Sequence, residues 1–210
     1  MLRLPLPLVS FLSGGLVYAI AGTIGLWLMG IAEGVPAFWP ANGLLVALIL
    51  TLGIRQIAWV LTGALTGSLL VQGFIDGGAM GMVITASDLA EVLVVAYAAH
   101  RLRIAGSGLE SIFSVVALVA VISVGATLSA LGAAAALHAF RGVPLGDTTS
   151  MLWRLNATSA LIILAPYFAI SKPGLREAIR RDANTTRIAE LAAILLLVVV
   201  AILSMQWTGV

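Results

Sequence analysis

Two carboxylates stand three residues apart, Asp88 and Glu91, inside the apolar stretch that runs from about residue 80 to 100. Residues at this spacing project from the same face of a helix. If the stretch crosses a bilayer, a carboxylate near its middle costs about 3 kcal/mol even on the lenient insertion scales, so the pair should face a bundle interior. Such a pair suits a proton relay, cation coordination or a ligand site. The alternative is a structural pair, hydrogen-bonded to Ser87, Thr85 and polar groups of other helices.

Arg154 is the natural counter-ion for these carboxylates, because it lies about one turn inside a later apolar stretch. An ion pair of Arg154 with Asp88 or Glu91 would join two helices. The alternative is that Arg154 extends to the membrane surface, where Trp153 would act as an aromatic anchor. Asn156 adds an amide to the same stretch.

The composition identifies the class of protein. Of the 210 residues, 61% are hydrophobic and 10% are charged, which indicates a membrane protein. The apolar stretches are about 20 residues long, as transmembrane helices require, and lack the alternation of barrel strands. The net charge of +2 is too small to indicate nucleic-acid binding. The absence of cysteine excludes disulfides, thiolate catalysis and cysteine-bound metals.

No motif indicates catalysis, a metal or a cofactor. The two histidines, His100 and His138, stand near opposite membrane surfaces, and HExxH, GxSxG and phosphate-binding glycine loops are missing. We therefore expect that the protein is not an enzyme and has neither metal nor cofactor.

Seven apolar stretches predict an all-α, polytopic bundle of seven transmembrane helices, forming one domain over 1–210. The expected bounds are 7–32, 38–54, 57–74, 80–100, 110–139, 149–170 and 189–207. Nine of the eleven basic residues fall on the side of the N-terminus, which predicts that this side is cytoplasmic. The nine are Arg3, Arg55, Arg101, Arg103, Lys172, Arg176, Arg180, Arg181 and Arg187.

The seventh crossing would leave the end of the chain outside. We expect that a final helix, which would return the chain to the cytoplasm, is missing. The basic segment 171–188 is expected to be a cytoplasmic loop, and a short helix lying on the inner leaflet is the alternative.

Small residues at four-residue intervals predict close helix contacts, because packing in lipid depends on backbone approach. Gly63 and Gly67 form one such face, Gly125 and Ser129 form a second, and Ala21 with Gly25 forms a third. A homodimer through one of these faces is a further expectation.

The opening of the second stretch carries a family resemblance. It reads Phe38-Trp39-Pro40-Ala41-Asn42-Gly43-Leu44 and leads through an apolar run to Gly53-Ile54-Arg55. This string resembles the membrane-associated sensor domain of the first MASE type, an integral membrane input module of bacterial signalling proteins. Further matches are Trp59, Leu61-Thr62-Gly63-Ala64, Glu91, His100-Arg101, Trp153 and Ala165-Pro166. Asp88 replaces a frequent asparagine, and Asn156-Ala157 replace a Gly-Asp pair.

The resemblance implies about eight helices, a bacterial cytoplasmic membrane and a fused cytoplasmic output domain, commonly a histidine kinase or a diguanylate cyclase. The chain would then be the input module of a receptor that senses a small molecule or a membrane partner within the bundle. The candidate sensing residues are Glu91, Asp88, Arg154, Trp153, Asn156, Trp39, Pro40, Asn42 and Gly43. For Trp39 and Pro40, an interface anchor with a helix-start proline is the alternative.

Two other functions are compatible with the sequence. The first is a small ion-coupled transporter that uses Asp88, Glu91 and Arg154, although no half-to-half repeat is evident. The second is a scaffolding protein that binds another membrane protein through its small-residue faces.

Overall fold

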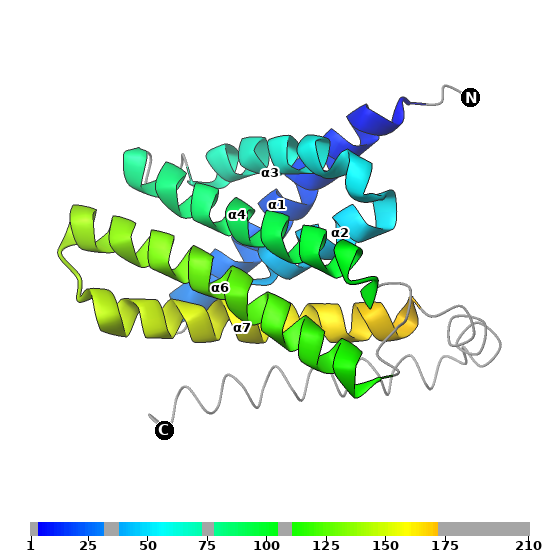
Figure 1. Ribbon diagram of the computed structural model, residues 1–210. Coiled ribbons are helices and arrows are strands. Elements are labelled where there is room, and N and C mark those ends of the chain that lie inside the picture. Colours follow the sequence, from blue (N-terminus) through cyan, green and yellow to red (C-terminus); the bar gives the residue numbers. More distant parts are fainter. Residues whose placement is uncertain (1–3, 32–37, 73–77, 105–110, 172–210) are drawn as a thin grey trace.

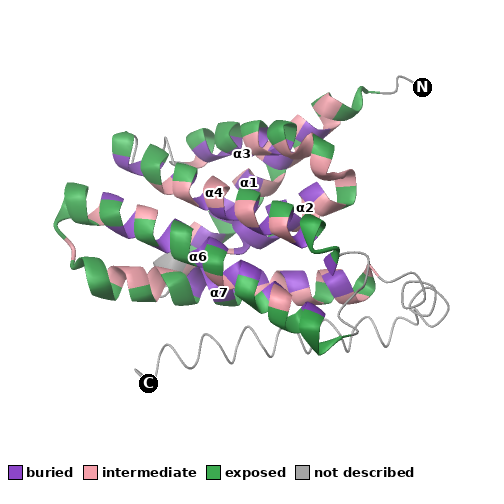
Figure 2. Cartoon of the chain, in the orientation of Figure 1, coloured by how far each residue is buried: buried purple, intermediate pink, exposed green. Residues whose placement is uncertain are grey.

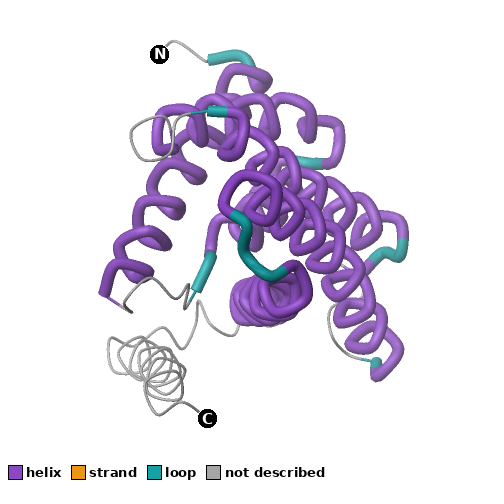
Figure 3. The backbone as a smooth tube through the Cα atoms, turned by 90° about the vertical axis from the view of Figure 1, so that its left-hand side faces the viewer, coloured by secondary structure: helices purple, strands orange, loops and turns teal. Residues whose placement is uncertain are grey.

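The computed structural model describes residues 4–31, 38–72, 78–104 and 111–171. Within these ranges the chain is helical and contains no strand (Figure 3). The elements are α1 (Leu6–Ile31), α2 (Pro40–Leu52), the 3-10 helix η1 (Ile54–Gln56), α3 (Ile57–Gln72), α4 (Ala79–Arg101), α6 (Ile112–Arg141) and α7 (Leu145–Ile170). The expected all-α fold is confirmed for this part of the chain.

Five apolar helices in these ranges are long enough to cross a membrane: α1, α3 with its preceding turn, α4, α6 and α7. The 23 residues of α4 rise about 35 Å, which exceeds the hydrocarbon thickness of about 30 Å. The chain is therefore a multi-pass membrane protein. The 13 residues of α2 rise only about 20 Å, so this helix is too short to cross alone.

The second helix is present where it was predicted, over about 38–54, but it is shorter than expected and does not reach the length of a full crossing. The helix starts at Pro40, whose missing N–H is harmless at the first helical position. It ends at Gly53, whose φ of 98° favours glycine. Ile54–Gln56 then turn the chain into α3.

The connection between α6 and α7 is shorter than predicted, because α7 begins at Leu145 instead of residue 149. Gly142 ends α6 with a φ of 68°, and Pro144 precedes the first turn of α7. The two helices consequently run antiparallel, side by side (Figure 1). The seventh expected helix, 189–207, and nearly all of the segment 171–188 lie outside the described residues. The cytoplasmic N-terminus stays a prediction.

Glycines bring α1 and α3 into backbone contact. A Cβ at Gly63 would overlap the carbonyl oxygen of Phe11, and a Cβ at Gly67 would overlap that of Gly15. The structure thus places two predicted packing glycines where only glycine fits. Their partners on α1 are Phe11 and Gly15.

The short helix α2 occupies the middle of the bundle. It packs against α1, α3, α4 and α7, and most of its residues are buried. Figure 2 shows the buried residues gathered between the helices and the exposed ones on the outer faces. Those outer faces carry large apolar side chains such as Trp27, Ile112 and Phe113, as a lipid-facing surface does. The interior is therefore where polar side chains require an explanation.

Candidate functional site

Five polar side chains from four helices meet in the middle of the bundle, and we call them the polar cluster. They are Asn42 of α2, Asp88 and Glu91 of α4, Ser129 of α6 and Asn156 of α7. Asp88 is 5% exposed and Glu91 is 1% exposed. Both carboxylates therefore lie inside the protein and not against lipid.

Asn42 links α2 to both carboxylates. Its Nδ2 donates to Glu91 Oε2 at 2.9 Å and, more weakly, to Asp88 Oδ1 at 3.4 Å. Because the two hydrogens of one amide serve two acidic side chains, Asn42 holds the beginning of α2 against the middle of α4.

Ser129 and Asn156 extend the network to the other two helices. The Ser129 hydroxyl donates to Asp88 Oδ1 at 2.8 Å, and Asn156 Nδ2 donates to Ser129 Oγ at 3.0 Å. An unbroken chain of hydrogen bonds therefore runs from α7 through α6 and α4 to α2. Nearby, Ser68 of α3 and Thr85 of α4 form a separate buried hydroxyl pair.

The backbone of α2 begins inside the bundle. Pro40, Asn42 and Gly43 are buried, and the backbone N–H of Trp39 donates to Ser159 Oγ, in the middle of α7, at 2.9 Å. The N-terminal end of a helix carries about half a positive elementary charge. Since Asn42 of the first turn contacts both carboxylates, this partial charge faces the acidic pair.

Trp39 closes this entrance against α1. Its ring meets Tyr18 edge to face, with centroids 6.4 Å apart. A Cβ at Gly25 would come within 2.6 Å of Trp39 Cε3, so the glycine makes room for the indole. Gly43 similarly faces Ile163 of α7. These small residues determine how deeply the opening of α2 is inserted.

Three buried polar atoms around the polar cluster have no hydrogen-bond partner. They are Trp39 Nε1, Asn42 Oδ1 and Glu91 Oε1. A buried polar atom without a partner typically costs about 1–3 kcal/mol. The two oxygens belong to side chains already joined by the 2.9 Å bond, so adjacent groups both retain an unused acceptor.

Arg154 does not neutralise the acidic pair in the structure. It is exposed, and its Nε donates to the carbonyl of Ser150 in the preceding turn at 3.3 Å. Arg154 and Asn156 are two residues apart, which places them on nearly opposite faces of α7. Since Asn156 points inward, Arg154 points outward. Among the described residues, Arg154 forms no ion pair with Asp88 or Glu91, and of the two arrangements considered for it only the one directed to the surface agrees with this position.

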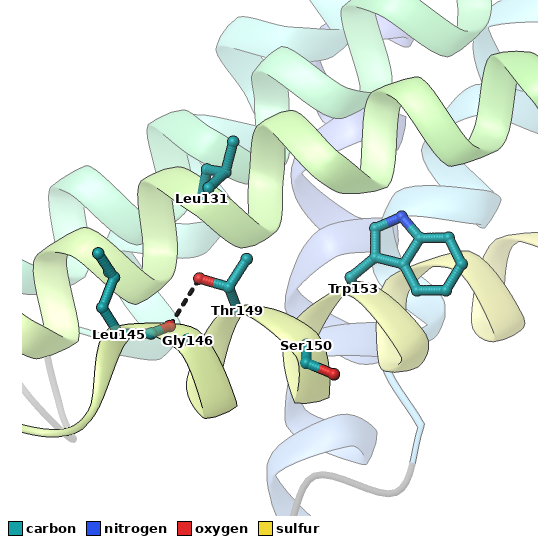
Figure 4. Close-up of a pocket in the computed structure, with 6 residues that line it drawn as sticks. All are labelled: Leu131, Leu145, Gly146, Thr149, Ser150 and Trp153. Carbon is teal, nitrogen blue, oxygen red and sulfur yellow. Dashed lines mark hydrogen bonds between the residues drawn. The ribbon is translucent and has the colours of Figure 1, made fainter.

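Trp153 also lies apart from the polar cluster. It is exposed, and its Nε1 donates to the carbonyl of Ser123 at 3.3 Å. Together with Leu131 and Thr149 it lines an open depression of about 460 Å³ between α6 and α7 (Figure 4). Thr149 is bonded to the carbonyl of Leu145 at 2.7 Å, so the depression offers mainly an apolar wall.

The role of Ser129 was not predicted from the sequence. Its spacing from Gly125 indicates a packing residue, whereas its hydroxyl bridges Asp88 and Asn156. Gly125 does pack closely, since a Cβ there would lie 2.6 Å from Val95 Cγ2. A serine in a row of small residues gives no local signal for its partner.

The polar cluster presents oxygen ligands, which hard cations prefer. The acidic members of the polar cluster are Asp88 and Glu91. Within the described ranges, no group of three or more His, Cys, Asp or Glu side chains could hold a metal ion. That donor set is poor for a transition metal.

In a comparison with known families, residues 10–210 match the MASE1 family. This match confirms the resemblance based on the opening of α2. No curated protein and no solved structure matches the chain.

Proposed function

Because the chain belongs to the MASE1 family of membrane sensory domains, we propose that it is the input module of a bacterial receptor whose stimulus acts on the polar cluster. Domains of this family are sensory and not themselves catalytic. The proposal locates the chain in the bacterial cytoplasmic membrane, with its N-terminus inside. Its output would be a fused histidine kinase or diguanylate cyclase.

One observation carries the proposal: hydrogen bonds in the middle of the bundle join four helices, and one of them is the short helix α2, which takes part through its first turn. A sensor needs two packings whose balance a stimulus can shift, typically by about 1–3 kcal/mol. Asn42 and Glu91 each have a buried oxygen without a hydrogen-bond partner. A stimulus that provides partners for these oxygens in one packing but not in the other would change the free-energy difference between the packings by about that amount.

The test measures output from the full-length native product in isolated membranes. We expect Glu91→Gln to change kinase or cyclase activity about fivefold or more, the lower end of ordinary allosteric coupling. Asp147→Asn is the matched control, because it removes an exposed carboxylate from the first turn of α7. If Glu91→Gln accumulates normally and both variants retain wild-type output, the polar cluster is not where the signal is read.

The same experiment reports the length of the native product. A tag at the start of the chromosomal gene should reveal a protein well above the 21.7 kDa of this chain. A native product of only 21.7 kDa would have no room for an output enzyme and would contradict the proposal that the protein is a receptor.

A small ion-coupled transporter is the second candidate, favoured by one feature. Carriers often use discontinuous helices that end at the membrane midplane, and α2 begins in the middle of the bundle. Proteoliposomes separate the two functions. Substrate accumulation above an empty-vesicle control, lost in Glu91→Gln, would replace the sensor with a carrier.

A further inference from the structure

Among the residues that the structure describes, no group with a full positive charge contacts the acidic pair. The neighbours that interact with Glu91 are Asp88 on its own helix and Asn42, Ser129 and Asn156 on α2, α6 and α7. On α3, the buried hydroxyl of Ser68 bonds Thr85. Within the described part of the chain, Asp88 is thus the one titratable neighbour of Glu91.

Partial charges do not balance two carboxylates. The beginning of α2 contributes about half an elementary charge, and Asn42 and Ser129 contribute hydrogen-bond donors. A buried carboxylate without a paired charge is strongly disfavoured. Roughly one further positive charge would complete the polar cluster.

The unused acceptors show where that charge would lie. Asn42 Oδ1 and Glu91 Oε1 are both buried and unpartnered, and their side chains are joined through Asn42 Nδ2 and Glu91 Oε2. Neither oxygen can be satisfied by the other, because both are acceptors when Glu91 is ionised. A single positive group between them would satisfy both.

We propose that the polar cluster binds one monovalent cation, a proton or sodium, with Asn42 Oδ1 and Glu91 Oε1 as its ligands. This deepens the proposed function by naming the ligand of the same cluster. A proton on Glu91 Oε1 would be donated to Asn42 Oδ1, closing a reciprocal pair of hydrogen bonds between acid and amide. Sodium would instead coordinate the two oxygens.

The donor set favours a single charge over a divalent ion. Calcium takes 6–8 oxygen ligands, often several of them carboxylates. The polar cluster has two carboxylates, and that of Asp88 already accepts from Ser129 and Asn42. It therefore supplies fewer oxygen ligands than calcium needs. With one monovalent cation bound, the pair keeps a single negative charge, which the donors and the α2 terminus face.

Occupancy of this site would control the contact between α2 and α4. With the cation bound, Asn42 and Glu91 are joined twice, by the Nδ2–Oε2 hydrogen bond and by the cation between Oδ1 and Oε1. Without it, two carboxylates repel each other in a low dielectric, and one end of the pair is unsatisfied. In the empty state we therefore expect the first turn of α2 to pack less tightly against α4.

Thermal unfolding of the purified chain in nanodiscs tests the site. Unfolding is measured in sodium chloride and in choline chloride at equal ionic strength, each at alkaline and at mildly acidic pH. A cation that binds the folded state raises its stability in proportion to ln(1 + [L]/Kd). We expect the wild-type Tm in choline to be lowest at alkaline pH and to rise by several degrees on acidification, on addition of sodium, or on both.

Glu91→Gln is the informative variant, because its amide can accept from Asn42 Nδ2 and also donate to Asn42 Oδ1. It should fold, and its Tm should not respond to sodium or to acidification in the way the wild type does. Asp147→Asn, which removes an exposed carboxylate, should respond as the wild type does. A response to neither cation in the wild type, or an unchanged response in Glu91→Gln, overturns the proposal.

The two cations are separated by their signatures. A proton gives a pH response in choline and a carboxylic acid C=O infrared band that disappears in Glu91→Gln; sodium gives a response at alkaline pH that choline does not reproduce. The readout is also independent of signalling. No cation response together with altered output in cluster variants would discard the cation and keep the sensor, whereas a cation response with unchanged output would discard the sensor alone.

Discussion

At the scale of residues, Asn42 is the centre of the candidate site. An amide can donate two hydrogen bonds and still retain an acceptor, and Asn42 uses both capacities by bonding Glu91 and Asp88 while leaving Oδ1 open. A carboxylate here would add a third negative charge, and an apolar residue would leave both acids with fewer partners. Few side chains could therefore replace it.

Asn42→Leu should destabilise the bundle by about 1–3 kcal/mol. The substitution nearly preserves volume but removes the donor to two buried carboxylates, which then bear the cost of unmade hydrogen bonds. Reversible unfolding in bicelles or mixed micelles would measure the loss. Arg154→Gln is the contrast, because Arg154 is exposed and bonds only a local carbonyl among the interactions of the described residues.

For Arg154→Gln we expect a change within about 0.5 kcal/mol, as for most surface substitutions. A loss of 3 kcal/mol or more, typical of breaking a buried ion pair, would restore the bridge to α4 that the structure does not contain.

At the scale of elements, glycines control how near the helices approach. The α1–α3 contact is between backbones, which cannot move aside as side chains do, since a Cβ at Gly63 overlaps the carbonyl oxygen of Phe11. At Gly125 the neighbour is the end of the Val95 side chain. The same substitution should therefore cost different amounts at these positions.

Gly63→Ala should destabilise the bundle by about 2–3 kcal/mol, as overpacking against a rigid neighbour does, and Gly125→Ala should cost less. Gly146→Ala is the matched control, because a Cβ there meets nothing within 4 Å. The control should be neutral or stabilising by up to about 1 kcal/mol, the helix-propensity gain of alanine over glycine. Unfolding midpoints in one lipid system would rank the three, and equal losses at Gly63 and Gly146 would contradict the backbone contact.

At the scale of the whole molecule, the direction of insertion determines which side could hold an output enzyme. The C-terminal end of α4, which Leu102 follows, and the beginning of α7, which contains Gly146, lie at opposite ends of the bundle (Figure 1). The basic residues predict that the Leu102 side is cytoplasmic.

The absence of cysteine makes this orientation easy to measure. In intact spheroplasts, a membrane-impermeant maleimide should label Gly146→Cys at once and Leu102→Cys only after permeabilisation. Both positions are exposed and lie at helix ends, so we expect the reagent to reach each of them from its own side of the membrane. The reverse labelling pattern would invert the bundle and place the end of α4 outside.

The sequence by itself determined the class, the family and nearly all the described crossings. Hydropathy is summed over about 20 neighbouring residues, so it needs no knowledge of distant partners. The same local logic identified Asp88 and Glu91 as interior residues, because a carboxylate in a span must avoid lipid. It overestimated α2, because an apolar run of crossing length looks the same whether the helix begins at the surface or within the bundle.

Only the tertiary structure decided which groups meet. Each helix rotates about its own axis until backbones and side chains fit, and that rotation depends on contacts such as Gly63 against Phe11, far apart in the chain. It turns Asn156 and Ser129 inward toward Asp88 and leaves Arg154 outside. It also brings Asn42 to Glu91, 49 positions away. Spacing along one helix shows which residues share a face, but only packing decides which side chains of the other helices meet that face.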